Sequence, residues 1–138
     1  MVGLVVVSHS ERAAEGIAEI AAEMADDTRI EPVGGDGKGG IGTVPDAIED
    51  AIDAAAGGSG DGAHGSDGEA DGVVVLVDLG SAVMNADVAV ELSDAEAVIA
   101  DAPVLEGAVN AAVAATDPSA TVESVREQAE AARDIEKL

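Results

Sequence analysis

His9 is the side chain in this 138-residue sequence that is best placed to act as a nucleophile. It follows the apolar run 2–7 (VGLVVV) and stands between Ser8 and Ser10. A neutral imidazole can form a covalent bond to phosphorus. A phosphorylated ring would face the free N–H groups of the following helix, and Ser8 and Ser10 would be further donors. His9 is therefore either a phosphoryl acceptor or a residue that only caps the strand–helix turn.

Asp78 is the second candidate, because it directly follows the apolar run 73–77 (VVVLV). A carboxylate beside His9 would hold the proton on one ring nitrogen and leave the other nitrogen bare. The alternative is that Asp78 caps the next helix. A Ser-His-Asp hydrolase fits less well, because Ser8 and Ser10 are sequence neighbours of His9 and no G-x-S-x-G segment occurs.

The segment 34–42 is a loop in which six of nine residues are glycine, and it leads into Thr43. Lys38 is followed by glycine, so the loop is neither a Walker A sequence nor a dinucleotide fingerprint. We expect no bound nucleotide and no cofactor. The backbone near Gly42 either approaches a phosphate beside His9 or forms a mobile surface loop.

The segment 57–72 is rich in Gly, Asp and Ser and contains His64. This composition predicts a flexible acidic insertion. One histidine among scattered carboxylates is a poor metal site, so we expect no bound metal.

Alternating strand and helix patterns predict an α/β fold. The runs 2–7, 29–33, 73–77 and 97–100 are predicted strands of a mainly parallel sheet in the order 2-1-3-4, and a short fifth strand remains open. Pro32 indicates an edge position for the second strand. We interpret residues 1–138 as a single domain flanked by helices. His9 and Asp78 would then meet at the point where the strand order reverses.

The expected helices begin with cap residues and bury their larger apolar side chains. Ser8 with Glu11 resembles a capping box, and Thr43 resembles an N-cap followed by Pro45. The helix from Ser81 is predicted to bury its largest apolar side chains, and a final helix is predicted over 119–135. The predicted buried faces comprise Ala13, Ile17, Ile20, Ala21 and Met24; Val44, Ile48, Ala51, Ile52 and Ala55; Met84, Val88 and Leu92; and Val122, Val125, Ala129 and Ala132.

The chain has 29 acidic and 6 basic residues, a formal charge of −23, and no aromatic residue or cysteine. Such a surface repels nucleic acids and anionic lipids, and it has no aromatic platforms for base stacking. No apolar run approaches the roughly 20 residues that cross a bilayer. We expect a cytoplasmic protein without nucleic-acid or membrane partners. High salt screens such self-repulsion, which favours a halophilic source.

Four segments together resemble the mannose-type IIA domains of the phosphotransferase system (PTS). These segments are VVVSHS at 5–10, GG-x5-IGT at 34–43, DLGSA-x-MN at 78–85 and AP-x2-EG at 102–107. Within that family they resemble the DhaM branch, the phosphotransfer subunits of PTS-dependent dihydroxyacetone kinases. The likeness covers nearly the whole chain except 57–72.

The resemblance implies that His9 is phosphorylated on Nε2 and that Asp78 is the carboxylate near it. It also implies a phosphate or partner contact for Ser8, Ser10, Gly42, Thr43, Gly80 and Ser81. The donor would be the phosphocarrier HPr, and the acceptor would be ADP held by DhaL, which acts with DhaK on dihydroxyacetone. Relatives of this fold are usually homodimers.

Two other interpretations remain open. One is the IIA component of a mannose-type sugar transporter, which the segment 78–82 disfavours. The other is a non-catalytic regulatory protein of the same fold, which the presence of His9 disfavours.

Overall fold

The computed structural model describes residues 1–57 and 71–138. The predicted insertion, with His64, therefore lies mostly outside the described residues. The described strands are β1 (Val2–Ser8), β2 (Ile30–Gly34), β3 (Gly72–Val77) and β4 (Ala97–Ile99). The helices are α1 (Glu11–Met24), α2 (Pro45–Ala55), α3 (Gly80–Leu92), α4 (Val104–Ala115) and α5 (Val122–Ala131), and a 3-10 turn (Ala132–Asp134) follows α5.

The four strands are all parallel and lie in the order β2-β1-β3-β4. This confirms the predicted α/β sheet and its topology. Pro32 lies on the edge strand β2, where a missing N–H is tolerated. No fifth strand occurs in residues 1–57 and 71–138.

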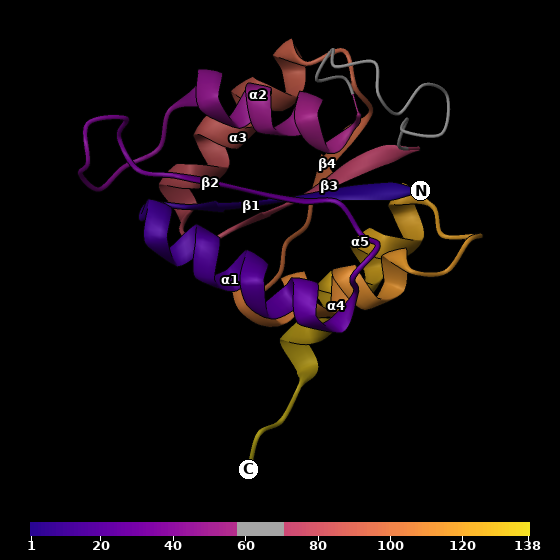
Figure 1. Ribbon diagram of the computed structural model, residues 1–138. Coiled ribbons are helices and arrows are strands. Elements are labelled where there is room, and N and C mark those ends of the chain that lie inside the picture. Colours follow the sequence, from indigo (N-terminus) through magenta and orange to yellow (C-terminus); the bar gives the residue numbers. More distant parts are fainter. Residues whose placement is uncertain (58–70) are drawn as a thin grey trace.

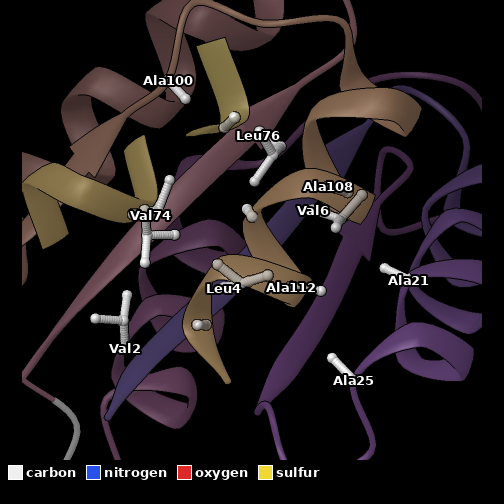
Figure 2. Close-up of a cluster of buried hydrophobic side chains, with 14 of the residues drawn as sticks. Val2, Leu4, Val6, Ala21, Ala25, Val74, Leu76, Ala100, Ala108 and Ala112 are labelled. Carbon is white, nitrogen blue, oxygen red and sulfur yellow. The ribbon is translucent and has the colours of Figure 1, made fainter. Parts of the chain in front are cut away.

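The helices form two layers around the sheet (Figure 1). Helices α1, α4 and α5 pack on one face, and α2 and α3 pack on the other. The strands β1 and β3 are therefore buried on both faces, which explains why their sequences are apolar without alternation. Figure 2 shows their side chains beside Ala108 and Ala112 of α4.

Small side chains let the layers approach closely. The buried residues of α1 are Ala14, Ala18 and Ala21. On the other face, a Cβ added to Gly3 would lie 2.3 Å from the carbonyl oxygen of Ala55 at the end of α2. The strand therefore requires glycine at this position, because any side chain would collide with helix backbone.

The predicted buried faces of α2 and α5 are largely confirmed, that of α1 is confirmed for Ile17 and Ala21 only, and that of α3 is wrong. In α3 the buried residues are Ala82, Ala86 and Ala89, whereas Met84 is 72% exposed. The other large apolar residues predicted to be buried in these two helices but found exposed are Ile20, Met24, Val88 and Leu92. The physical reason is close packing, because the alanine faces allow a shorter distance to the sheet than the larger residues would.

The helix starts also differ from the prediction. Ser10, not Ser8, caps α1 and accepts a hydrogen bond from the N–H of Ala13, because β1 continues through Ser8. Val44 is the N-cap of α2 and has no side-chain cap, so Thr43 is free for another contact. The last helix begins at Val122, later than predicted, after a capping box made by Thr121 and Ser124.

Helix α1 carries a continuous row of like charges. Glu11, Glu15, Glu19 and Glu23 are spaced by four residues and are all exposed. Glutamates at this spacing are neighbours on the helix surface, and each like-charged pair costs about 0.2–0.5 kcal/mol. Repulsion along this row therefore destabilises the folded protein, and added salt screens it.

We expect the free energy of unfolding to rise by on the order of 1 kcal/mol between 0.1 M and 1 M NaCl, since three such pairs are relieved as the Debye length falls from about 10 to 3 Å. Urea titrations at each salt concentration measure this change. The double variant Glu15→Gln, Glu23→Gln should be more stable in low salt and respond less to added salt. A wild-type stability that stays constant or falls with NaCl would contradict the expectation.

Candidate active site

The candidate site lies where the central strands β1 and β3 end. The two strands pair in register from Val2 with Gly72 to Val7 with Val77. Their next residues, Ser8 and Asp78, therefore lie side by side at the carboxyl edge of the sheet. His9 follows Ser8 immediately, so the chain brings the histidine and the carboxylate together as the sequence predicts.

Asp78 binds this end of β1 through both of its oxygens. Its Oδ1 lies 2.9 Å from Nδ1 of His9. Its Oδ2 accepts hydrogen bonds from the His9 backbone N–H at 3.0 Å and from the Ser8 hydroxyl at 2.8 Å. An ionised carboxylate only accepts, so Nδ1 carries the ring proton and Nε2 of the neutral ring keeps its lone pair.

The same contacts set the ionisation of Asp78. Burial acts to raise the pKa of this carboxyl, but the hydrogen bonds from the His9 backbone, the His9 ring and Ser8 outweigh it. The pKa of Asp78 therefore lies below its ordinary value, and the group is negatively charged at neutral pH. A fixed negative charge beside Nδ1 stabilises positive charge on the ring.

The second ring nitrogen faces the start of α3. Nε2 of His9 lies 2.6 Å from Oγ of Ser81, whose hydroxyl donates to the bare nitrogen. Gly80 is the first residue of α3, and the N-cap Leu79 provides no side-chain cap. The first-turn N–H groups and the positive end of the helix thus lie beside Nε2, an environment that favours an anion.

The glycine-rich loop contacts the backbone of His9 and not its ring. The N–H of Gly42 donates to the His9 carbonyl at 2.8 Å. A Cβ on Gly34 would lie 2.4 Å from the Ser8 carbonyl oxygen, so the loop starts in close contact with the end of β1. Within the loop, Asp36 accepts hydrogen bonds from the backbone N–H groups of Lys38 and Gly40 at 2.8 and 2.9 Å.

The loop is also attached to α3. The side chain of Asn85 donates to Oγ1 of Thr43 at 2.6 Å. Thr43 therefore holds the loop against α3 and does not reach the His9 ring through any described contact. No role for Asn85 was predicted from the sequence, although one polar side chain in the buried half of an apolar helix is a usable signal.

The predicted site residues thus fall into two groups. His9, Asp78, Ser8 and Ser81 are joined by hydrogen bonds. The others do not contact the His9 ring: Ser10 caps α1, Gly42 binds the His9 carbonyl, Thr43 binds Asn85, and Gly80 is the first residue of α3. Ser8 is turned toward Asp78, so its predicted contact with a phosphate is not what this geometry favours, and the alternative of Asp78 as a helix cap does not occur.

The arrangement contains a partly buried carboxylate, an imidazole and a hydroxyl, each hydrogen-bonded to the next. Ser81, His9 and Asp78 have the connectivity of a Ser-His-Asp triad, although the sequence places only Ser8 and Ser10 beside the histidine. The His9 side chain is 19% exposed, so its ring can be reached by a partner. Within residues 1–57 and 71–138, no cluster of three or more metal-binding side chains occurs, and no helix is long and apolar enough to cross a bilayer.

Comparisons with known proteins give a consistent assignment. Residues 3–126 match the family model EIIA-man, described as PTS system fructose IIA component. The phosphotransferase subunit DhaM of the PTS-dependent dihydroxyacetone kinase of Lactococcus lactis is 36% identical over 93% of both chains. The phosphoryl donor subunit DhaM of the PEP-dependent dihydroxyacetone kinase 1 of Listeria innocua is 39% identical over 77% of this chain and 75% of its own.

The crystal structure of EF1359, a protein of unknown function, has the same fold with a TM-score of 0.73. The two sequences are 25% identical, and the match covers 94% of this chain and 92% of EF1359. The match to the family model covers more than half of the chain, and the Lactococcus relative aligns along nearly its whole length. The chain therefore belongs to the EIIA-man family of phosphotransferase-system IIA components and, within it, to the DhaM group.

Proposed function

We propose that this protein carries a phosphoryl group on Nε2 of His9 and delivers it within a dihydroxyacetone kinase system. HPr donates the group, and ADP held by DhaL accepts it, so that DhaL with DhaK can phosphorylate dihydroxyacetone. The observation that carries the proposal is the pair of contacts on the His9 ring. Asp78 holds the proton on Nδ1, and Nε2 faces Ser81 and the start of α3. The named activity of the relatives, phosphoryl donation, supports the same conclusion.

The transfer follows from this arrangement. The Nε2 lone pair attacks the phosphorus, the bond to the donor imidazole breaks, and that electron pair stays with the donor. The ring of His9 becomes positive as the new bond forms, and the ionised Asp78 stabilises that charge through Nδ1–H. Ser81 turns its hydroxyl from Nε2 to a phosphoryl oxygen, and the first-turn N–H groups of α3 face the same group.

We also propose that the protein acts in the cytoplasm of a salt-rich cell. It would do so as a single domain without a cofactor. A IIA component of a sugar transporter would use the same histidine. Transfer of phosphate from the phosphorylated protein to ADP-loaded DhaL, followed by formation of dihydroxyacetone phosphate with DhaK, separates the two. A phosphorylated protein that gives no product with these subunits would favour the transporter, and a protein that accepts no phosphate would favour the regulatory alternative.

We expect His9→Gln to abolish phosphorylation by phosphoenolpyruvate, enzyme I and HPr, because the only proposed acceptor atom is lost. Intact-protein mass spectrometry with and without brief acid treatment measures the acid-labile phosphate. His64→Gln is the matched control, since it removes the second histidine of the chain and should retain full phosphorylation. Phosphate that persists in His9→Gln would refute the carrier mechanism.

Asp78→Asn should slow phosphorylation of His9 by about 100-fold or more, because an amide carries no charge and can present N–H to Nδ1. Rapid-quench measurement with phosphorylated HPr tests this expectation. A rate within threefold of the wild type would show that the carboxylate is not needed.

The lowered pKa of Asp78 also predicts a pH dependence of stability. Its contribution is present above the ordinary carboxyl pKa and is lost as the pH falls through the lowered value. The difference in stability between wild type and Asp78→Asn should therefore be largest near neutral pH and shrink below about pH 4. A difference that grows in acid would contradict the assignment of charge.

The triad-like contacts make an acyl hydrolase the second candidate, because Ser81 donates to a histidine that is itself held by Asp78. The carrier requires no covalent bond at Ser81. Ser81→Ala should therefore still accept phosphate on His9, with a rate reduced by no more than about tenfold. Acylation of Ser81 by p-nitrophenyl acetate in the wild type, and its loss in Ser81→Ala, would instead support the hydrolase.

We further propose that two copies associate, as the resemblance implies, and that the outer face of α3 forms their interface. Val83, Met84, Val88 and Leu92 are exposed there, and no described part of the chain covers them. These apolar residues extend from the first turn of α3 to its last residue, whereas His9 contacts the helix only at its start, through Ser81.

Sedimentation equilibrium in 1 M NaCl should give a dimer for the wild type and a monomer for Met84→Lys, because the substitution puts a charge in the proposed interface. Ile20→Lys makes the same change at an exposed residue of α1 and should remain dimeric. A monomeric wild type, or a dimeric Met84→Lys, would remove α3 as the interface.

A further inference from the structure

The chain has few basic residues, and only some of them form ion pairs with acidic residues. Three of the six lie in the C-terminal part and form ion pairs, namely Arg126 with Glu123, Arg133 with Asp101 and Lys137 with Glu106. Arg29 has an interaction of its own. Arg12 and Lys38 form no ion pair with any residue in 1–57 and 71–138.

These two unpaired cations lie at the same edge of the molecule as His9. Arg12 is the second residue of α1 and follows His9 by three positions. Lys38 lies in the glycine-rich loop, which extends beyond the carboxyl ends of the strands next to the start of α1 (Figure 1). The loop touches the His9 carbonyl through Gly42, so the backbone segments that carry Arg12, Lys38 and His9 meet at this edge.

A hollow of about 430 Å³ separates the start of α1 from this loop. Its lining includes Ser10, Glu11 and Arg12 from the helix start, and Ile41 with four glycines of the loop. The space is large enough for the phosphates of a nucleotide that a partner presents, and it is open to solvent. Arg12 is the cation in this lining.

No carboxylate of residues 1–57 and 71–138 lies within ion-pairing distance of Arg12. Asp36 is committed to the loop, because backbone N–H groups of Lys38 and Gly40 bind its Oδ1. Glu11 lines the same hollow, but its carboxylate lies outside ion-pairing distance of Arg12, since no such pair occurs between these two described residues. Arg12 therefore keeps an unpaired charge in a chain whose formal net charge is −23.

The transfer to ADP places the largest electrostatic demand on this edge. A phosphohistidine and a nucleoside diphosphate are both anionic, and the field of the acidic protein opposes their approach. A guanidinium remains charged at every physiological pH and matches phosphate oxygens with paired N–H donors. A cation beside two meeting phosphates lowers the barrier because it stabilises charge on the group in transit.

We propose that Arg12 binds the phosphates of the nucleoside diphosphate acceptor while His9 gives up its phosphoryl group, and that Lys38 strengthens this binding. The inference rests on the proposed function, because it assigns the acceptor step of the same site. In that step the P–Nε2 bond of His9 breaks and its electron pair returns to Nε2. A terminal phosphate oxygen of the diphosphate forms the new P–O bond, and Nδ1–H stays on Asp78 throughout.

Two single-turnover measurements separate the donor step from the acceptor step. The first follows phosphorylation of the protein by phosphorylated HPr, and the second follows loss of phosphate from the purified phosphoprotein to ADP-loaded DhaL. Arg12→Gln should slow the second reaction by about 100-fold, the order expected for loss of one charged donor to a transferring phosphoryl group, and leave the first within threefold. Arg12→Lys should lie between Arg12→Gln and the wild type, because it keeps the charge but loses the paired donors.

Arg126→Gln is the matched control, because it removes a paired arginine on α5 and should leave both rates unchanged. Lys38→Gln should slow the acceptor step less than Arg12→Gln does. Equal acceptor rates for Arg12→Gln and the wild type would overturn the proposal, and so would an equal slowing of both steps, which would indicate a general docking role. A wild-type protein that accepts no phosphate from HPr would refute the proposed function itself, and this outcome is visible before any Arg12 variant is examined.

Discussion

The hydrogen bonds from the end of β1 to Asp78 are the contacts on which the site depends. They exist only because β1 and β3 pair with Val7 opposite Val77, which places Ser8 and Asp78 together at the sheet edge. A slip of one residue would turn Asp78 to the other face. Close packing against the helices resists that slip, because only glycine fits at position 3, where a Cβ would lie 2.3 Å from the carbonyl oxygen of Ala55. The packing of the helix layers thus fixes the tautomer of one imidazole ring.

Much of the sheet could be predicted from the sequence, because continuous β-branched runs between helical patterns leave few arrangements. The strand order and the meeting of His9 with Asp78 followed from that pattern and from the right-handed crossover rule. The faces of α1 and α3 could not be predicted in the same way. A ranking by hydrophobicity selects Met84 as a core residue, whereas close approach of the helix to the sheet selects Ala82 and Ala86.

The hydrogen bonds around the site were less predictable than the strands, because their partners are distant in sequence. Whether Ser8 or Ser10 caps α1 depends on the residue at which β1 ends, and that residue is set by the pairing of Ser8 with Gly34 of β2. The Ser8 hydroxyl is in turn bound by Asp78, 70 positions away. Thr43 has the composition of a cap, but Asn85 engages its hydroxyl across 42 positions. Local propensity identifies polar groups that need partners and leaves the choice of partner to the tertiary structure.

The distribution of charge suits a carrier better than a storage site. A carrier must release its phosphoryl group to the next protein. If it bound the phosphorylated state much more tightly than the transition state of transfer, the barrier to release would rise. The contacts beside Nε2 are neutral donors, namely the hydroxyl of Ser81 and the start of α3. The unpaired cation, Arg12, lines the hollow between the start of α1 and the glycine-rich loop. A cation that is not bonded to Nε2 does not tighten the phosphorylated state at rest, and it is available to the phosphates that a partner brings to the site.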